Sequence, residues 1–162
     1  MIKAILACDN NGGVSREGTI PWPKNTKDLS WFKKNTTNNV VVMGSKTWLD
    51  PLMPWPLPNR VNVLATSREA SFPGADKYIC GDLNGELEAL KEEYPSKTIW
   101  VIGGPNIIEQ TLESIEEFYL SKIPGAYDCD GFLSLEDIKS LFKKVWFEKH
   151  DSVEFQIWKK IK

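Results

Sequence analysis

IPWPKNTKDLSWFKKNT, residues 20–36, places one carboxylate among aromatic side chains at the start of a helix. Its proline-rich beginning cannot belong to a regular helix, because proline lacks the backbone N–H group and clashes with the preceding turn. Asn25 or Thr26 can cap a helix, and residues 27–35 contain no helix breaker. We therefore predict a helix that begins at about Thr26 and carries Asp28 in its first turn.

Asp28 borders the face that this helix turns toward the protein interior, because it is one helical turn from Phe32 and adjacent to Leu29. One explanation is structural: an aspartate in a first turn interacts with free backbone N–H groups and the positive end of the helix dipole. The other explanation is a ligand. A carboxylate at an apolar wall can accept paired hydrogen bonds from a flat, amidine-like heterocycle, while Phe32 and Trp22 offer ring surfaces.

Length and composition predict one globular domain that spans residues 1–162. With 41% hydrophobic and 26% charged residues, the chain can bury a substantial core. The formal net charge of −2 gives no general attraction for nucleic acid or acidic membranes, so we expect neither partner. No apolar run reaches membrane length and the N-terminus does not resemble a signal peptide, which predicts a soluble, cytoplasmic protein.

The cysteine and histidine content argues against metal-dependent chemistry. Cys8, Cys80 and Cys129 are odd in number, widely spaced and form no CxxC motif, so neither a disulfide framework nor a zinc site is expected. His150 is the only histidine, and no nucleophile elbow accompanies it. We expect no metal ion, a reducing compartment, and a position for His150 on a late strand.

Short apolar runs without polar alternation predict strands that are buried on both faces. Two late period-two runs around residues 151–152 predict a terminal hairpin. The fold class is therefore α/β: a central, mostly parallel mixed sheet, flanked by helices and ending in an antiparallel hairpin. The predicted strands before the hairpin are residues 2–8, 40–44, 61–65, 98–102 and 118–123, and the predicted helices are residues 26–35, 45–48, 83–94 and 106–112.

The segment between the first predicted strand and the first predicted helix is a long loop. Residues 9–18 are rich in turn-forming residues and lead into the proline-rich segment before Asp28. Long loops in compact domains are uncommon unless they act as lids or binding segments. We interpret this loop as a candidate lid, with an idle surface loop as the alternative.

Polar and basic residues follow the carboxyl ends of the predicted strands, where open α/β sheets bind ligands. Residues 45–47 begin a helix directly after one strand, and residues 66–68 follow the next. Backbone N–H groups at a helix start can hold a phosphate. The paired glycines at residues 103–104 let a backbone approach a flat ring or a pyrophosphate, although an ordinary tight turn would also favour them. Together these strand ends indicate a nucleotide.

The motifs also occur in a fixed order along the chain, and this order is more specific than any single motif. They are Ala7, residues 20–22, Asp28-Leu29, Trp31-Phe32-Lys33, Met43-Gly44, Thr47-Trp48, Leu57-Pro58, Arg60, Thr66-Ser67, residues 101–104 and Glu109-Gln110. This series resembles the dihydrofolate reductase family over nearly the whole chain.

The resemblance implies that Asp28 is catalytic, as the sole acidic group of a folate pocket that binds the pterin ring and favours protonation at N5. Ser121 stands where a hydroxyl usually supports this carboxylate. Arg60 resembles the arginine that holds the α-carboxylate of the glutamate tail, a bidentate task, although a surface arginine is the alternative. The other substrate-binding positions that the resemblance implies are Ile5, Ala7, Leu29, Phe32, Leu57 and Ile102.

The same resemblance implies NADPH as the cofactor. Trp22, with residues 9–24, is similar to a lid over the nicotinamide, which makes Trp22 the second catalytic candidate, and Asp130 resembles a position that contacts this lid. The family typically joins the glycine pair by a cis peptide bond. The implied cofactor-binding positions are Ala7, Val14, Ile20, Gly44, Ser45, Lys46, Thr47, Thr66, Ser67, Arg68, Ile102, Gly103, Gly104, Pro105, Asn106, Ile107 and Gln110.

Several residues differ from the family pattern. Ser45 and Lys46 stand where an arginine and a histidine are frequent, so the 2′-phosphate would depend more on Lys46 and Arg68. Asn59 replaces a glycine, and asparagine tolerates left-handed geometry better than most residues. The other differences are Ser15 at a usual glycine, Pro105 after the glycine pair, Ile108 at a usual aromatic hydroxyl, and a longer connection at residues 51–58.

We therefore expect a monomeric, NADPH-dependent reductase that converts 7,8-dihydrofolate to 5,6,7,8-tetrahydrofolate by hydride transfer to C6 and protonation at N5. A pyrimidine reductase of riboflavin biosynthesis shares the fold, but the helix that carries Asp28 and the presence of Arg60 disfavour it. A binding protein that kept the fold without turnover is the alternative from another class, because Ser15, Ser45 and Ile108 differ from the pattern.

Overall fold

The computed structural model describes residues 1–51 and 56–161. Its strands are β1 (Ile2–Cys8), β2 (Gly13–Ser15), β3 (Val40–Gly44), β4 (Val61–Ala65), β5 (Lys77–Ile79), β6 (Ile99–Gly103), β7 (Glu117–Lys122), β8 (Gly131–Phe132), β9 (Phe142–Lys149) and β10 (Glu154–Lys160). Its helices are α1 (Thr26–Thr36), α2 (Ser45–Trp48), the 3-10 helix η1 (Glu69–Ser71), α3 (Leu83–Glu93), α4 (Pro105–Thr111) and α5 (Leu135–Leu141).

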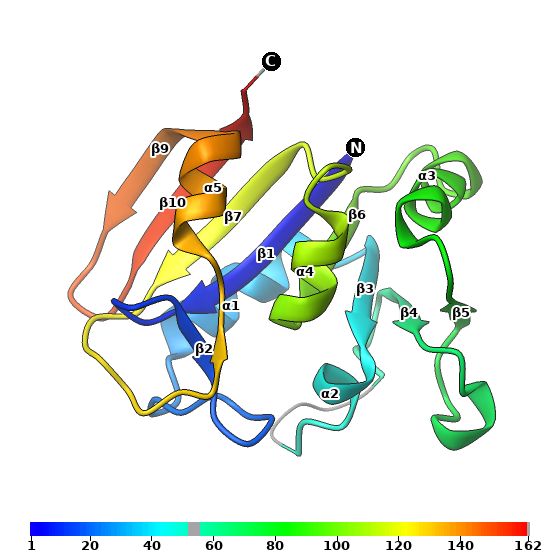
Figure 1. Cartoon of the computed structure of the whole chain (residues 1–162), viewed down its shortest axis with the longest axis horizontal. Coiled ribbons are helices and arrows are strands. Elements are labelled where there is room, and N and C mark those ends of the chain that lie inside the picture. The colour runs from blue at the N-terminus through cyan, green and yellow to red at the C-terminus, as the bar shows by residue number, and fades with distance from the viewer. Residues whose placement is uncertain (52–55, 162) are drawn as a thin grey trace.

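One eight-stranded sheet, in the order β5-β4-β3-β6-β1-β7-β10-β9, organises the chain (Figure 1). From β5 to β7 every neighbouring pair is parallel, whereas β10 is antiparallel to β7 and β9 is antiparallel to β10. The predicted α/β class, with a mostly parallel sheet and a terminal antiparallel hairpin, is confirmed. The carboxyl ends of β3, β4 and β6 therefore lie beside one another.

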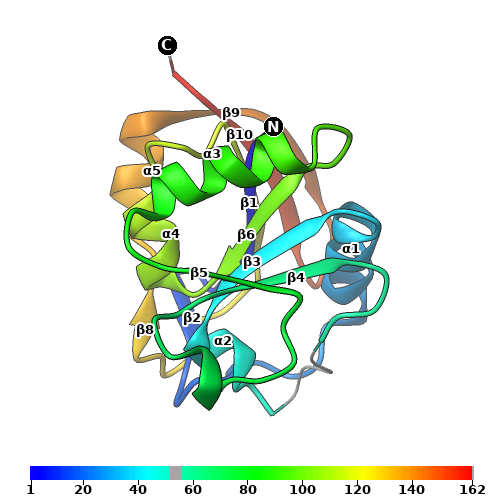
Figure 2. The same cartoon turned by 90° about the vertical axis from the view of Figure 1, so that its right-hand side faces the viewer.

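Helices cover both faces of the sheet, which explains why its central strands are apolar without alternation. Figure 2 shows α1 on one side of the sheet and α3, α4 and α5 on the other. One core cluster packs the strands against α3, α4 and α5, and includes Leu87, Ile108 and Ile138. A second lies on the α1 side and includes Val41 and Met43, both fully buried.

The predicted strands and helices occur within a residue or two of their expected ends, but the sequence analysis missed several short elements. The strands β2 and β8 pair only with each other, and β5 has three residues. Such short strands carry too little periodicity to be recognised, and α5 spans only seven residues. The prediction that His150 lies on a strand is wrong: β9 ends at Lys149, and His150 begins the turn, where its N–H donates to the carbonyl of Val153.

Candidate functional site

Asn25, rather than Asp28, caps α1. The Asn25 side-chain oxygen accepts a hydrogen bond from the backbone N–H of Asp28 at 2.9 Å, and Asn25 itself has an extended backbone. This satisfies one of the free donors of the first turn. Helix capping therefore does not account for the carboxylate of Asp28, which forms a hydrogen bond with the hydroxyl of Ser121.

The surroundings of Asp28 make its carboxyl a stronger base than an aspartate in water. Burial raises the pKa of Asp28 above its usual value, and the hydrogen bond from Ser121 offsets part of that rise. Ser121 is 1% exposed and lies in β7, directly opposite Ala7 of β1. Two central strands thus fix the hydroxyl, and the pair that the sequence predicted is brought together.

All but one of the apolar residues expected around the substrate belong to two clusters on the α1 side of the sheet. Trp31 of α1 packs against both clusters and stacks on Phe155, with ring centroids 4.4 Å apart. Leu29 is partly buried and belongs to neither. One cluster contains Ile5, Phe32, Leu57 and Ile102, and the other contains Ala7, Ile20 and Trp22.

Arg60 is held beside the carboxyl end of α1. Its Nε donates to the carbonyl of Pro58 and its Nη1 to the hydroxyl of Thr36, each at 3.0 Å. Asn59 has a positive φ of 59°, as expected for an asparagine at a usual glycine. Arg60 is partly buried, and burial lowers its pKa. The fully buried Thr36, which the sequence analysis did not single out, thus orients a side chain that would otherwise move freely.

Glycines bring the starts of α2 and α4 close to each other. Gly44 and Gly104 are the N-cap residues of these helices, and neither helix start has a side-chain cap. A Cβ on Gly44 would lie 2.9 Å from Cγ1 of Ile107, and one on Gly103, whose φ is 138°, would lie 3.2 Å from Oγ1 of Thr47. The predicted cis peptide between Gly103 and Gly104 is present. Backbone N–H groups of two helix starts are therefore available at one edge of the sheet.

Hydroxyl and basic side chains follow the neighbouring strand at the same edge. The end of β4 lies beside the end of β3, so residues 66–68 follow β4 close to the start of α2. The Thr66 hydroxyl accepts from the backbone N–H of Arg68 at 3.0 Å. Lys46, Ser67 and Arg68 are exposed. This donor set, together with the uncapped helix starts, fits the phosphates of a dinucleotide.

The predicted lid is tied to the segment after β7. The backbone N–H of Glu17 donates to the Asp130 carboxylate, and the N–H of Asp130 donates to the carbonyl of Ser15, both at 2.9 Å. The predicted contact of Asp130 with the lid is therefore confirmed. Val14 lies in β2 and is 7% exposed. Trp22 is buried at the other end of this loop, where its ring meets Tyr127 edge to face.

Asp9, which anchors the lid at the end of β1, was missed as a structural group by the sequence analysis. Its fully buried carboxylate accepts from the backbone N–H groups of Asn11 and Gly13, each at 2.9 Å, and of Tyr127 at 2.8 Å. Burial alone would raise the pKa of Asp9, but these donors outweigh it, so the pKa lies below its usual value. The available signal was a carboxylate directly after a buried strand and before an Asn-Asn-Gly-Gly turn.

The predicted cofactor-binding residues of α4 lie along the whole helix, so only those in its first turn are at this glycine-rich edge. Pro105 occupies the first turn of α4, and the exposed Asn106 follows it. Gln110 lies near the other end of α4, where its carbonyl accepts from the Asn84 side chain at 3.1 Å. Ile108 is 1% exposed and packs into the core on the α3 side. At this position the chain has a core residue in place of the hydroxyl that the family pattern favours.

Comparisons with known proteins agree with this arrangement. A sequence model of the family described as "Dihydrofolate reductase" matches residues 1–159. The chain is 32% identical to the dihydrofolate reductase of Drosophila melanogaster, over 79% of this chain and 76% of that protein. It is 25% identical to the viral dihydrofolate reductase of Saimiriine herpesvirus 2 (strain 488), over 99% of this chain and 85% of that protein.

Two other matches differ in what they cover. A putative bifunctional dihydrofolate reductase-thymidylate synthase of Oryza sativa subsp. japonica is 36% identical over 88% of this chain, but the match covers only 31% of that protein. Among solved structures, the dihydrofolate reductase from Enterococcus faecalis complexed with NADP(H) and RAB-propyl superposes with a TM-score of 0.79. That match has 22% identity and covers 99% of this chain and 96% of that one, so it bears on the fold.

A mostly parallel α/β sheet with uncapped helix starts and basic residues at its strand ends, beside a partly buried carboxylate, is typical of nucleotide-dependent oxidoreductases. Within that class, the family match over residues 1–159 shows that the chain belongs to the dihydrofolate reductase family. It reduces dihydrofolate to tetrahydrofolate and uses NADPH, so the principal functional prediction from the sequence is confirmed.

Proposed function

We propose that Asp28 binds the pterin ring of dihydrofolate and promotes protonation at N5. The observation that carries this assignment is the pair of Asp28 with the buried Ser121 hydroxyl, next to the apolar residues of α1 and the sheet. Because Asn25 caps α1, the helix does not need the carboxylate of Asp28. A raised pKa suits a group that stabilises a proton on a bound base.

The other residues that we propose to bind the substrate lie on the same side of the sheet as Asp28. Arg60 binds the glutamate-tail carboxylate, since its guanidinium is already oriented by Thr36 and Pro58. A fork of N–H donors matches a carboxylate better than a single ammonium group does. The proposed apolar contacts are the partly buried Leu29 and the cluster residues Ile5, Ala7, Phe32, Leu57 and Ile102.

The edge formed by the starts of α2 and α4 is proposed to bind the cofactor. When bound, NADPH supplies the hydride that C6 of the substrate accepts. Lys46, Ser67 and Arg68 hold the 2′-phosphate, and Trp22 with the rest of the lid excludes water from the reacting atoms. The remaining proposed contacts are Ala7, Val14, Ile20, Gly44, Ser45, Thr47, Thr66, Ile102, Gly103, Gly104, Pro105, Asn106, Ile107 and Gln110.

Titrations of each ligand into variants of each proposed subsite test this division into a substrate part and a cofactor part. Arg60→Lys should weaken dihydrofolate binding about tenfold or more and leave NADPH binding unchanged, because Lys offers a point charge where a fork is wanted. Arg68→Ala should instead narrow the preference for NADPH over NADH by about tenfold or more. Lys143→Ala, an exposed change on β9, is the control for both. Equal preference of the wild type for NADPH and NADH, or an unchanged dihydrofolate affinity in Arg60→Lys, would contradict the assignment.

The proposal also includes a single domain of residues 1–162 that acts as a monomer in the cytoplasm. One sheet takes strands from both ends of the chain, β1 and β10, which supports a single folding unit. Cys8, Cys80 and Cys129 are unbridged, as suits a reducing compartment. Within the part of the chain that the structure describes, no helix is long and apolar enough to cross a membrane. Light scattering tests the monomer, and a mass of two chains would contradict it.

A further inference from the structure

A pocket of about 150 Å³ lies between α5 and the sheet, away from the proposed substrate and cofactor residues. Three of its lining residues belong to α5, which covers the face of the sheet opposite α1 (Figure 2). None of the residues assigned above lines it. The lining residues are Leu120, Lys122, Leu135, Ile138, Lys139, Lys144, Gln156 and Trp158.

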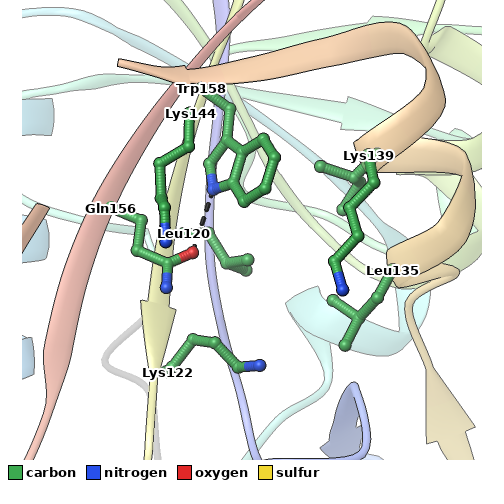
Figure 3. Close-up of a pocket in the computed structure, with 8 residues that line it drawn as sticks. Leu120, Lys122, Leu135, Lys139, Lys144, Gln156 and Trp158 are labelled. Atoms are coloured by element: carbon green, nitrogen blue, oxygen red, sulfur yellow. Dashed lines mark hydrogen bonds between the residues drawn. The ribbon is translucent and has the colours of Figure 1, made fainter. Parts of the chain in front are cut away.

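Lysines from separate elements surround this pocket. Figure 3 shows Lys122 of β7, Lys139 of α5 and Lys144 of β9 placed around Leu120. Within residues 1–51 and 56–161, none of these lysines forms an ion pair within 4 Å. Glu154 is the acidic residue in register with Lys122, so the three lysine charges outnumber this one carboxylate. Like charges gathered around one pocket repel one another, and a bound anion would relieve that repulsion.

The polar groups in the wall of the pocket are already paired with each other. The indole N–H of Trp158 donates to the side-chain oxygen of Gln156 at 2.9 Å, and the amide nitrogen of Gln156 donates to the Glu154 carboxylate. Gln156 is 4% exposed, which fixes this arrangement. The groups that remain available to a ligand are the apolar surface and the lysine ammonium groups. The ammonium group of Lys144 lies 5.8 Å from the centroid of the Trp158 ring.

The dimensions of the pocket limit its occupant. A cavity of about 150 Å³ holds a single benzene-sized ring. A phosphate monoester carries a charge of about −1.5 to −2 at neutral pH, which suits a site with several cations better than a monoanion does. We propose that this pocket binds a small aryl phosphate monoester, with its ring against Leu120 and Trp158 and its phosphate between Lys122, Lys139 and Lys144.

The direct test is a titration of phenyl phosphate into the enzyme saturated with NADPH, followed by the NMR signal of the Trp158 indole N–H. Saturation with NADPH removes the proposed cofactor phosphate sites from the experiment. We expect a saturable shift with a dissociation constant on the order of 1 mM, because the ligand has few heavy atoms. Absence of a saturable shift at Trp158 would overturn the proposal.

Matched lysine variants locate the binding. Lys144→Gln and Lys139→Gln should each weaken phenyl phosphate binding about threefold to tenfold, as expected for charge-assisted contacts from exposed side chains. Lys143→Gln removes the same charge from the adjacent position of β9, whose side chain points to the other face of the sheet, and should leave binding unchanged. Equal weakening by Lys143→Gln and Lys144→Gln would reduce the effect to general electrostatics and overturn the site.

Ligand variants test the chemistry. Phenol keeps the ring without the charge, inorganic phosphate keeps the charge without the ring, and benzoate carries one negative charge. Each should bind more weakly than phenyl phosphate, since it lacks one of the features that the pocket recognises. Binding of any of them as tight as that of phenyl phosphate would overturn the choice of an aryl phosphate.

Discussion

Replacing Asp28 with asparagine removes one negative charge and nearly nothing else. The amide has the size of the carboxyl group, can accept the Ser121 hydrogen bond through its oxygen, and leaves the Asn25 cap untouched because that bond uses the backbone N–H of residue 28. The fold should therefore persist. Reductase activity at neutral pH should fall sharply, because the charge that favours a protonated substrate is gone.

The size of the loss follows from how little solvent could replace that charge. The carboxyl is desolvated enough for its pKa to be raised, and its hydroxyl partner, Ser121, is 1% exposed. Removing one group of a preorganised polar site typically costs about 2.7–4 kcal/mol of transition-state stabilisation. At about 1.36 kcal/mol for each factor of ten, we expect kcat/KM of Asp28→Asn to fall about 100- to 1,000-fold.

The deficit should depend on pH. As the solution becomes acidic, solvent protonates the substrate without help, while the wild-type carboxylate begins to neutralise above the usual aspartate pKa of 3.8. The assay is NADPH oxidation with dihydrofolate, measured for wild type, Asp28→Asn and the exposed control Asp151→Asn from neutral to mildly acidic pH. A variant as active as wild type at neutral pH, or a deficit that does not shrink on acidification, would remove Asp28 from the mechanism.

Stability provides an independent readout of the same residue. Because the folded-state pKa of Asp28 is raised, the native state binds more protons than the unfolded state between the usual and the raised pKa, and stability falls as pH rises through that window. Apo Asp28→Asn should therefore be more stable than wild type at neutral pH, and the difference should vanish below the usual pKa. Urea unfolding at both pH values measures it, and a destabilised variant at neutral pH would show that the charge supports the fold.

The other predictions concern groups that position the site. Ser121→Ala removes the bond that lowers the pKa of Asp28, so the acid limb of the kcat/KM profile should move to higher pH, and an unmoved limb would contradict the pairing. Gly44→Ala should cost about 1–3 kcal/mol in urea unfolding and weaken NADPH binding, because its Cβ would lie 2.9 Å from Cγ1 of Ile107, and an unchanged unfolding midpoint would contradict this. Asp9→Asn should destabilise the protein by about 1–3 kcal/mol, because an amide N–H would face backbone donors, and an unchanged unfolding midpoint would refute this.

Much of the fold could be predicted because its central strands carry a strong local signal. Residues 40–44 form an unbroken apolar run, and the structure buries all of them as β3. By contrast β2 and β8 exist only because segments distant in sequence meet, with Ser15 in register with Gly131. No local pattern in either segment specifies such a pair, so its recognition requires the tertiary structure.

The candidate site was predictable where a residue's type constrains its chemistry, and less so where its neighbours do. Asp28 stood out as a carboxylate bordering an apolar face, and Asn59 as a residue suited to positive φ. The role of Thr36 depends on Arg60 reaching it across 24 residues of sequence, which no local pattern reveals. For the same reason Ile108 could be recognised as a departure but not as a core residue.

Asp9 and Asp28 show why environment, rather than residue type, separates structural from chemical carboxylates. Asp9 is fully buried, accepts hydrogen bonds from three backbone N–H groups and has a lowered pKa, whereas Asp28 is partly buried, is paired with the Ser121 hydroxyl and has a raised pKa. The N–H donors hold Asp9 in its charged form, so it anchors the lid and does not exchange protons near neutral pH. Asp28 lacks these backbone donors, so its ionised form is less stabilised than the ionised form of Asp9. We therefore expect proton chemistry on a bound heterocycle at position 28 and not at position 9.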